Sequence, residues 1–274
     1  MRYASFLTPQ GQAAFGRVEG QRVVQLTGAA DLRSAIEAGS LADLESGEAF
    51  DIAKLTLLPV IPNPGKIICI GLNYETHRKE TGRAEAERPA VFVRFADTLV
   101  AHGAPIVRPK VSTQLDYEGE LAVIIGRAGR AIPQDKALEH VAGYACFNEA
   151  SVRDWQRHNI QFTPGKNFPG TGAFGPWLTT PDEVGDLAAQ HVVTRLNGMV
   201  VQDQPISEMI WPVGELIAYV STFTPLSPGD VIATGTPGGV GARRDPPLWM
   251  QPGDRVEVEI GKVGLLSNPV VQEG

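Results

Sequence analysis

After residue 66, apolar residues alternate with polar ones or run together in many short segments. Such segments, bounded by glycine and proline, are typical of β-strands. They predict strands at 67–70, 90–94, 120–125, 192–196, 231–233 and 255–260. Two longer segments, 133–140 and 213–222, have the spacing of helices. Many strands with few long helices predict an α+β, mainly β fold, built as a rolled mixed sheet rather than a doubly wound one.

A proline-rich connector at 59–65 divides the chain. Proline fixes φ and lacks an N–H donor, so this segment is typical of a linker. It separates a small N-terminal α/β domain at 1–58 from a larger domain at 66–274.

The small domain contains two recognisable local signals. Residues 20–26 predict the return of a hairpin, and Asp31 predicts the start of a helix. The apolar residues expected on that helix are Leu32, Ile36, Leu41 and Leu44.

Composition narrows the class of protein. Of the 274 residues, 43% are hydrophobic and 20% are charged, which is enough apolar material for a packed core. The formal net charge of −7 argues against nucleic acid and anionic membranes as partners. Cys69 and Cys146 lie in apolar surroundings, which predicts buried free thiols in a reducing compartment. With no apolar run approaching about 18 residues, we expect a cytoplasmic protein.

The first candidate for chemistry is an acidic strand. Asp116, Glu118 and Glu120 recur at every second position, so on one strand they share a face. Clustered carboxylates suit Mg²⁺, Mn²⁺ or Ca²⁺ better than zinc. The alternative is a solvated strand face, and Glu257 and Glu259 have the same spacing elsewhere in the chain. The spacing alone does not show whether Glu118 and Glu120 or Glu257 and Glu259 bind a metal ion.

His77 and Glu80 form a second candidate. Three residues apart, they share a face of a helical turn, where a carboxylate can orient an imidazole as a general base. A solvated surface turn is the alternative. His158 is a weaker candidate for the entrance of a pocket. The glycine-rich segment 234–241 lacks the spacing of a phosphate-binding loop, so it predicts a tight turn.

An ordered series of motifs resembles the fumarylacetoacetate hydrolase family from about residue 66 to 269. Each motif alone is weak, and the ordered set is strong. The series comprises GLNYETHRKE at 71–80, VAGY at 141–144, NEASVRDWQ at 148–156, GKNF at 165–168, GPW at 175–177, NG at 197–198, VQD at 201–203, ELIAY at 215–219 and PGDVIATGTP at 228–237.

Three positions depart from the family pattern. Glu149 stands where the family usually has Asp, so the third metal ligand would be one methylene longer. The usual FLKP appears as FVRF at 92–95, and the usual KSFD appears as KNFP at 166–169.

The resemblance implies a fumarylacetoacetate-hydrolase-type β-roll and a homodimer. It implies a site for Mg²⁺ or Mn²⁺, with Ca²⁺ as a further option, held by Glu118, Glu120 and Glu149. On a mobile lid, His77 and Glu80 would activate water. The remaining roles implied are oxyanion stabilisation by Lys166 and substrate contacts from Arg153, Gln156 and Thr236.

The reaction implied first is metal-dependent hydrolysis of a C–C bond in a 3-acylpyruvate through a pyruvate enolate. The same site would serve an oxaloacetate decarboxylase or tautomerase, or a 2-oxo-dioate isomerase or hydratase. A non-catalytic member of the fold is a third reading. These outcomes differ in how the far end of the substrate is held, and no motif distinguishes them.

Overall fold

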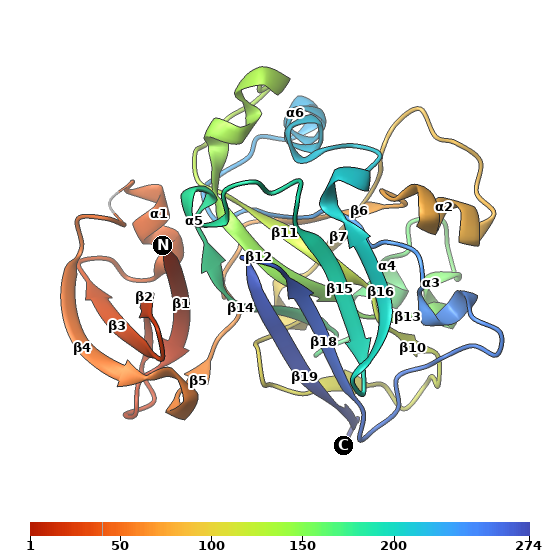
Figure 1. The fold of residues 1–274 in the computed structure, drawn as a ribbon, viewed down its shortest axis with the longest axis horizontal. Coiled ribbons are helices and arrows are strands. Elements are labelled where there is room, and N and C mark those ends of the chain that lie inside the picture. Colours follow the sequence, from red (N-terminus) through yellow and green to blue (C-terminus); the bar gives the residue numbers. More distant parts are fainter. Residues whose placement is uncertain (40) are drawn as a thin grey trace.

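The computed structural model describes residues 1–39 and 41–274, and it confirms a mainly β, α+β fold (Figure 1). The larger sheet has twelve strands, most of them antiparallel. Its main path runs in the spatial order β4 (Glu45–Asp51), β3 (Arg22–Thr27), β2 (Ala13–Glu19), β1 (Arg2–Leu7), β14 (Gly172–Thr179), β12 (Val141–Glu149), β11 (Gly119–Ile125), β17 (Val231–Ala233), β6 (Ile67–Gly71) and β7 (Ala90–Arg94). The short strands β5 (Thr56–Leu57) and β8 (Leu99–Val100) pair with β1 and β14.

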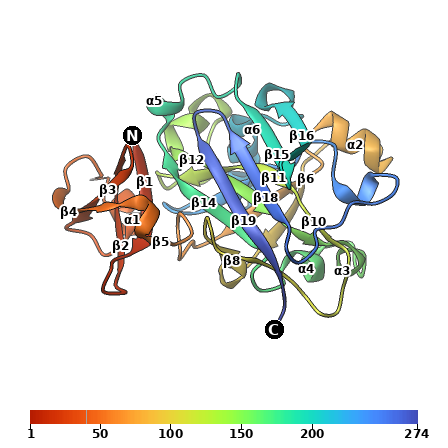
Figure 2. The ribbon, with the colours of Figure 1, turned by 60° about the horizontal axis from the view of Figure 1, so that its bottom comes forward.

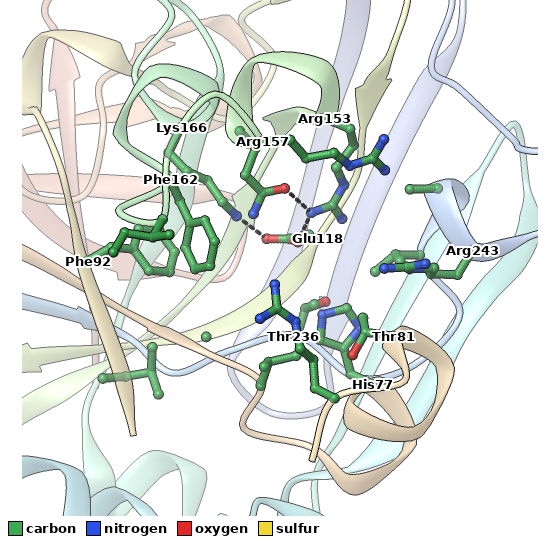
Figure 3. Close-up of a pocket in the computed structure, with 18 of the residues that line it drawn as sticks. His77, Thr81, Phe92, Glu118, Arg153, Arg157, Phe162, Lys166, Thr236 and Arg243 are labelled. Atoms are coloured by element: carbon green, nitrogen blue, oxygen red, sulfur yellow. Dashed lines mark hydrogen bonds and ion pairs between the residues drawn. The ribbon is translucent and has the colours of Figure 1, made fainter. Parts of the chain in front are cut away.

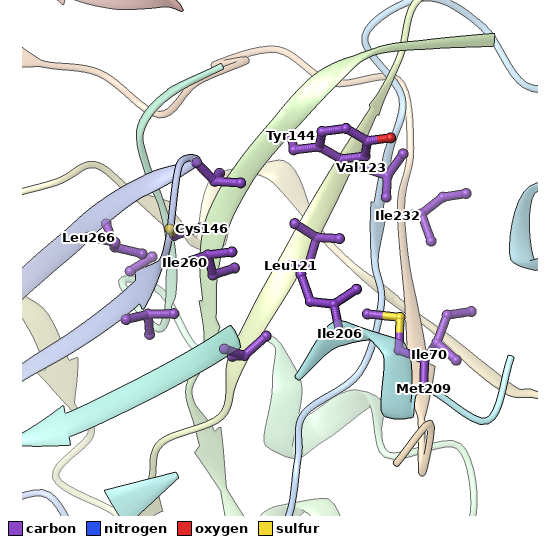
Figure 4. Packing of buried hydrophobic residues seen from close by; sticks show 14 of the residues in the cluster. Ile70, Leu121, Val123, Tyr144, Cys146, Ile206, Met209, Ile232, Ile260 and Leu266 are labelled. Carbon is purple, nitrogen blue, oxygen red and sulfur yellow. The ribbon is translucent and has the colours of Figure 1, made fainter. Parts of the chain in front are cut away.

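A smaller sheet packs against the larger one (Figure 2). Its order is β16 (Met199–Pro205), β15 (His191–Leu196), β18 (Arg255–Ile260), β19 (Gly264–Gln272) and β9 (Ile106–Arg108). A separate two-stranded ladder joins β10 (Leu115–Asp116) to β13 (Ser151–Val152). Between the two main sheets, Leu121 of β11, Cys146 of β12 and Ile260 of β18 meet in one hydrophobic core (Figure 4).

Helices are short and lie around the sheets. The α-helices are α1 (Leu32–Glu37), α2 (Glu75–Thr81), α3 (Arg153–Gln156), α4 (Thr163–Lys166), α5 (Pro181–Val184) and α6 (Val213–Phe223). The 3₁₀ helices are η1 (Ile52–Lys54), η2 (Ala96–Thr98), η3 (Gln134–His140), η4 (Ile206–Glu208) and η5 (Gly241–Arg243). In the part of the chain that the model describes, no helix is long and apolar enough to cross a membrane.

Most of the predicted elements are confirmed, with two corrections. The helix that Asp31 caps ends at Glu37, well before Leu41 and Leu44, because Gly39 adopts a left-handed φ of +65°. The segment predicted as a helix at 133–140 is the 3₁₀ helix η3, following Pro133. Cys69 and Cys146 are buried and free, as predicted.

The N-terminal strands stand to one side in Figure 1, yet they continue the larger sheet. Strand β1 pairs with β14 through Arg2 opposite Thr179 and Tyr3 opposite Leu178. The proline-rich connector has no helix or strand, and its Val60 and Ile61 are fully buried. The boundary between two domains stays a prediction.

Strand β11 determines where the site lies. It is flanked by β12 and β17, and all of its residues are buried. Leu121 and Val123 point into the core between the sheets, whereas Ala122 and Ile124 join a second core cluster on the opposite face. By the two-residue period, Glu120 faces the same side as Ala122.

Candidate active site

Three buried carboxylates converge where β11 begins and β12 ends. One carboxylate oxygen each from Glu118, Glu120 and Glu149 lies within 4.8 Å of the others. Glu118 immediately precedes β11, and its carbonyl accepts a hydrogen bond from the Glu149 N–H at 2.9 Å. The antiparallel pairing of β11 with β12 therefore brings together acids that are about thirty residues apart in the sequence.

Asp116 does not join this cluster, contrary to the expectation of one continuous acidic face. The strand is interrupted between β10 and β11, so the two-residue period does not extend to Asp116. Its carboxylate accepts hydrogen bonds from the N–H groups of Gly241 and Ala242 at 2.8 and 2.9 Å. It also accepts one from Nε of Arg153 at 2.8 Å, which anchors that side chain.

Cationic side chains surround Glu118. Lys166 Nζ lies 2.5 Å from Glu118 Oε2, and Arg153 Nη1 lies 2.7 Å from Oε1 (Figure 3). Burial alone would raise the pKa of Glu118, but the charges of Arg153 and Lys166 outweigh it and lower that pKa to about 2. Glu118 is therefore ionised at neutral pH.

Glu149 is held by a different cation. Its Oε1 lies 3.1 Å from Arg94 Nε, and both side chains are fully buried. Its Oε2 is buried without a hydrogen-bond partner, and Lys166 Nζ lies 3.6 Å from it. A buried carboxylate oxygen without a donor is costly, so this atom is a candidate ligand.

Glu120 is the acid that lacks a cationic partner. Within the described residues no Lys, Arg or His lies within 4.0 Å of its carboxylate, which accepts one hydrogen bond from the Gly235 N–H at 2.9 Å. Burial, together with the charges of Glu149 and Glu118, raises the pKa of Glu120 well above its ordinary value. A bound cation would relieve this repulsion, so the three glutamates fit a divalent metal ion.

The turn after β17 supports this arrangement. Gly235 has a φ of +100°, and a Cβ there would lie 2.7 Å from Asn73 Cβ, so only glycine fits. The segment is a tight turn, as predicted. Thr236 lines the cavity; its hydroxyl donates to the Gly119 carbonyl at 2.9 Å and accepts from Gln202 Nε2 at 2.8 Å.

His77 and Glu80 lie together on α2. His77 Nδ1 is 2.6 Å from Glu80 Oε1, and the imidazole is 9% exposed. The second oxygen of Glu80 accepts from the Gly239 N–H at 2.8 Å, and Thr76 Oγ1 accepts from the Gly238 N–H at 3.0 Å. These contacts dock the helix against the turn after β17, with His77 lining the cavity.

Glu118, Glu120 and His77 line a cavity of about 450 Å³. Glu149 and Glu80 are not part of the lining and contact these residues from behind. Phe92 and Phe162 form an apolar wall on one side, and Arg243 lies on the other (Figure 3). Gln156 lines the cavity and accepts a hydrogen bond from Arg153 Nη1 at 3.0 Å. His158 is also part of the lining, which agrees with its predicted position.

Arg94 was missed in the sequence because it lies on an apolar strand. Its neighbours Val93 and Phe95 are 45% and 53% exposed, so alternation on β7 places Arg94 inside. The exposed arginines at the mouth of the cavity, Arg83, Arg157 and Arg243, were missed because no spacing links them.

Comparison with known proteins agrees with this geometry. Residues 66–271 match the family model described as fumarylacetoacetate (FAA) hydrolase C-terminal, and residues 1–59 match one described as Rv2993c-like, N-terminal. The chain belongs to the fumarylacetoacetate hydrolase family, as the motifs indicated.

Two relatives carry the name oxaloacetate tautomerase, mitochondrial. FAHD2A of Homo sapiens is 40% identical over 245 residues, covering 83% of this chain and 78% of that protein. The fahd2 protein of Xenopus laevis is 41% identical over 221 residues, covering 80% and 69%.

Two solved structures are similar over essentially the whole chain. The fumarylacetoacetate hydrolase from Exiguobacterium antarcticum is 35% identical, with a TM-score of 0.85 and 100% coverage of both chains. The 2-hydroxyhepta-2,4-diene-1,7-dioate isomerase from Mycobacterium marinum is 29% identical, with a TM-score of 0.84 and coverage of 100% and 99%.

Proposed function

We propose that this protein is a divalent-metal-dependent enzyme that moves a proton at C3 of a small 2-oxo acid, with keto–enol tautomerisation of oxaloacetate as the first candidate reaction. The observation that carries this proposal is that Glu118, Glu120 and His77 line one cavity, with Glu149 beside the first two and Glu80 bound to His77. The relatives named oxaloacetate tautomerase favour this reaction over the acylpyruvate hydrolysis that the motifs implied first.

Glu118, Glu120 and Glu149 would hold the metal ion, with Mg²⁺ or Mn²⁺ as the first candidates because all donors are oxygen atoms. When bound, the cation supplies a Lewis acid that stabilises negative charge developing on the 2-oxo oxygen. The protein's own donors would orient the substrate. Arg153 Nη2 is buried without an acceptor, so a substrate carboxylate would satisfy it.

His77 would carry the proton. A neutral imidazole that donates from Nδ1 to Glu80 keeps Nε2 free as a base. In the tautomerisation, the C3–H bond breaks and an O–H bond forms at the 2-oxo oxygen, so no other reactant is consumed. Glu80, fixed by Gly239 and His77, would orient the ring and stabilise its protonated form during transfer.

Hydrolysis of a 3-acylpyruvate is the second candidate. Here His77 would accept a proton from water, the water would add at C4, and cleavage of the C3–C4 bond would give pyruvate and a second acid. The observation in its favour is the volume of about 450 Å³, which is large for a four-carbon acid.

A substrate panel tests both candidates. Oxaloacetate and several acylpyruvates would be assayed by enol absorbance with Mg²⁺, with Mn²⁺ and with a chelator, while released CO₂ and pyruvate are measured. We expect metal-dependent interconversion of the oxaloacetate tautomers without stoichiometric CO₂. Pyruvate formed from acylpyruvates would favour the hydrolase, CO₂ would favour a decarboxylase, and no metal-dependent turnover of any substrate would refute the proposal.

The homodimer stays a prediction, which a measurement of molar mass in solution would test.

A further inference from the structure

Arg94 is buried beside Glu149, and each nitrogen of its guanidinium group has an acceptor in the protein. Its Nε donates to Glu149 Oε1 at 3.1 Å, and both side chains are fully buried. Its Nη1 donates to the Thr171 hydroxyl at 2.9 Å, and its Nη2 donates to the Ala150 carbonyl at 3.0 Å. With an acceptor for every nitrogen, the planar guanidinium group is held in one orientation.

The surroundings of residue 94 leave room for this arginine. A Cβ at Gly172 would lie 2.9 Å from Arg94 Cδ and 3.2 Å from Nη1, so a side chain there would displace the arginine. The hydroxyl of Thr171 donates to the Phe168 carbonyl at 2.7 Å, which leaves its lone pairs to accept from Arg94. The packing around residue 94 therefore fits a guanidinium group.

The contact with Arg94 gives the two oxygens of Glu149 different partners. Oε1 is bound to Arg94, whereas Oε2 is buried without a hydrogen-bond partner. Glu149 is one of the three acids whose oxygens lie within 4.8 Å of one another. With Oε1 engaged, Oε2 is the atom that Glu149 can offer to a cation. Arg94 thus determines where the third carboxylate of the cluster lies.

Residues 94 and 149 are also two positions at which this chain departs from the family pattern. The usual lysine of FLKP is Arg94, and the usual aspartate is Glu149. The two differences compensate in length. The carboxylate of glutamate lies one bond further from the backbone than that of aspartate, whereas Nε of arginine lies one bond nearer to its backbone than Nζ of lysine. An Arg–Glu contact through Nε therefore spans the same number of bonds as a Lys–Asp contact through Nζ.

We propose that Arg94 is a positioning residue for the metal site, and that Arg94 and Glu149 can be exchanged for Lys and Asp only together. This inference rests on the proposed function, because it takes the three glutamates to hold a divalent cation. Arg94→Lys alone would bring Nζ one bond too close to the Glu149 carboxylate. Glu149→Asp alone would withdraw the carboxylate from Arg94 or from the cluster. Either change by itself displaces a metal ligand, and the double change restores the span.

The test is a double-mutant cycle of metal affinity. Binding of Mn²⁺ to the metal-free proteins is measured by isothermal titration calorimetry, which requires no turnover, and far-UV circular dichroism gives the folded fraction of each protein. Arg94→Lys and Glu149→Asp should each weaken binding by about tenfold or more, as expected when the partner that orients a metal ligand is disturbed. The double variant Arg94→Lys/Glu149→Asp should bind within about threefold of the parent, since the two changes are coupled.

Arg195→Lys/Glu259→Asp is the matched control, because Arg195 and Glu259 form an ion pair of 2.7 Å outside the cavity lining. This variant and its two single changes should keep the parental dissociation constant. A single variant at 94 or 149 that fails to fold, beside a double variant that folds and binds Mn²⁺, would show the same coupling.

Three results would overturn the inference: parental Mn²⁺ affinity in both single variants, losses that multiply in the double variant, or a double variant that does not fold. Absence of Mn²⁺ binding by the parent would overturn the proposed function as well. Coupled Mn²⁺ affinities without turnover of any substrate would refute the proposed reaction and support the positioning role of Arg94.

Discussion

Two strands of this protein carry the same Glu-x-Glu pattern in different environments. Glu118, immediately before the central strand β11, and Glu120, near its start, are 4% and 1% exposed. Glu257 and Glu259 are partly exposed on β18, where Glu259 pairs with Arg195 at 2.7 Å and Glu257 accepts from the Ser267 hydroxyl at 3.3 Å. The pattern determines which side chains share a face, and the position of the strand determines whether that face meets water.

The reason for the difference lies in the sheets. Both faces of β11 are covered, so acids on it must find a cation or a proton. Strand β18 alternates buried and partly exposed residues, so its acids stay hydrated. The two histidine–acid pairs differ in the same way. His77 and Glu80 are 9% and 21% exposed, whereas His191 and Asp203, with Nδ1 to Oδ1 at 2.7 Å, are 51% and 53% exposed.

The largest effect should follow from Glu120→Ala. This change removes the carboxylate that has no cationic partner, so we expect loss of metal-dependent activity and of thermal stabilisation by Mg²⁺. In the parent, a metal at a hundred times its Kd stabilises the folded state by about 2.7 kcal/mol. Differential scanning fluorimetry with Mg²⁺ and with a chelator measures this. Because the pKa of Glu120 is raised, protons compete with the metal, and the stabilisation should shrink as pH falls.

The matched control replaces Glu257 and Glu259 together with alanine. Activity and the Mg²⁺-dependent shift in Tm should both stay at the parental level. Loss of metal stabilisation in this control, or its persistence in Glu120→Ala, would show that the metal site has been assigned to the wrong pair.

The next largest effect concerns the histidine pairs. His77→Ala should lower kcat/KM by a factor on the order of 10² to 10⁴, the usual contribution of a positioned acid–base group. Stabilisation by Mg²⁺ should remain, because the expected metal ligands are the three glutamates and not His77. His191→Ala, which breaks a similarly short but exposed pair, should leave kcat/KM unchanged. If His77→Ala turns over substrate at the parental rate, the His77–Glu80 pair is only structural. His158 would then be the next candidate for the acid–base group.

Local patterns predicted the shared side of Glu118 and Glu120, because strand periodicity depends only on neighbouring residues. They did not predict their burial, which requires β12 and β17 from distant parts of the chain. Asp116 departs from the pattern because Gly241 and Ala242 supply N–H groups from a remote loop. Gly39 is the sequence signal for the end of α1 at Glu37. The prediction extended the helix past it because Leu41 and Leu44 continue the apolar spacing.

The family resemblance, and not strand periodicity, identified the third acid of the cluster. Glu149 entered the predicted cluster only through a motif, and the pairing of β11 with β12 accounts physically for its position. Arg94 lies in the segment FVRF at 92–95, where the chain departs from the family motif, and the motif assigned it no role. Its contact with Glu149 joins two of the positions at which this chain departs from the family pattern.

The remaining prediction concerns stability rather than turnover, and it compares two arginine–glutamate pairs, one buried and one partly exposed. Arg94→Ala leaves the buried Glu149 carboxylate without its closest cation, which costs about 3–5 kcal/mol when one partner of a buried pair is removed. Arg195→Ala breaks the Arg195–Glu259 pair, whose side chains are 28% and 42% exposed, and should cost less than about 1 kcal/mol. Urea denaturation of the metal-free proteins gives both free energies of unfolding. Arg94→Ala/Glu149→Ala should recover part of the loss, because it removes the unpaired charge as well. Similar losses for Arg94→Ala and Arg195→Ala, or no recovery in the double variant, would mean that the charge of Glu149 is balanced by Lys166 rather than by Arg94.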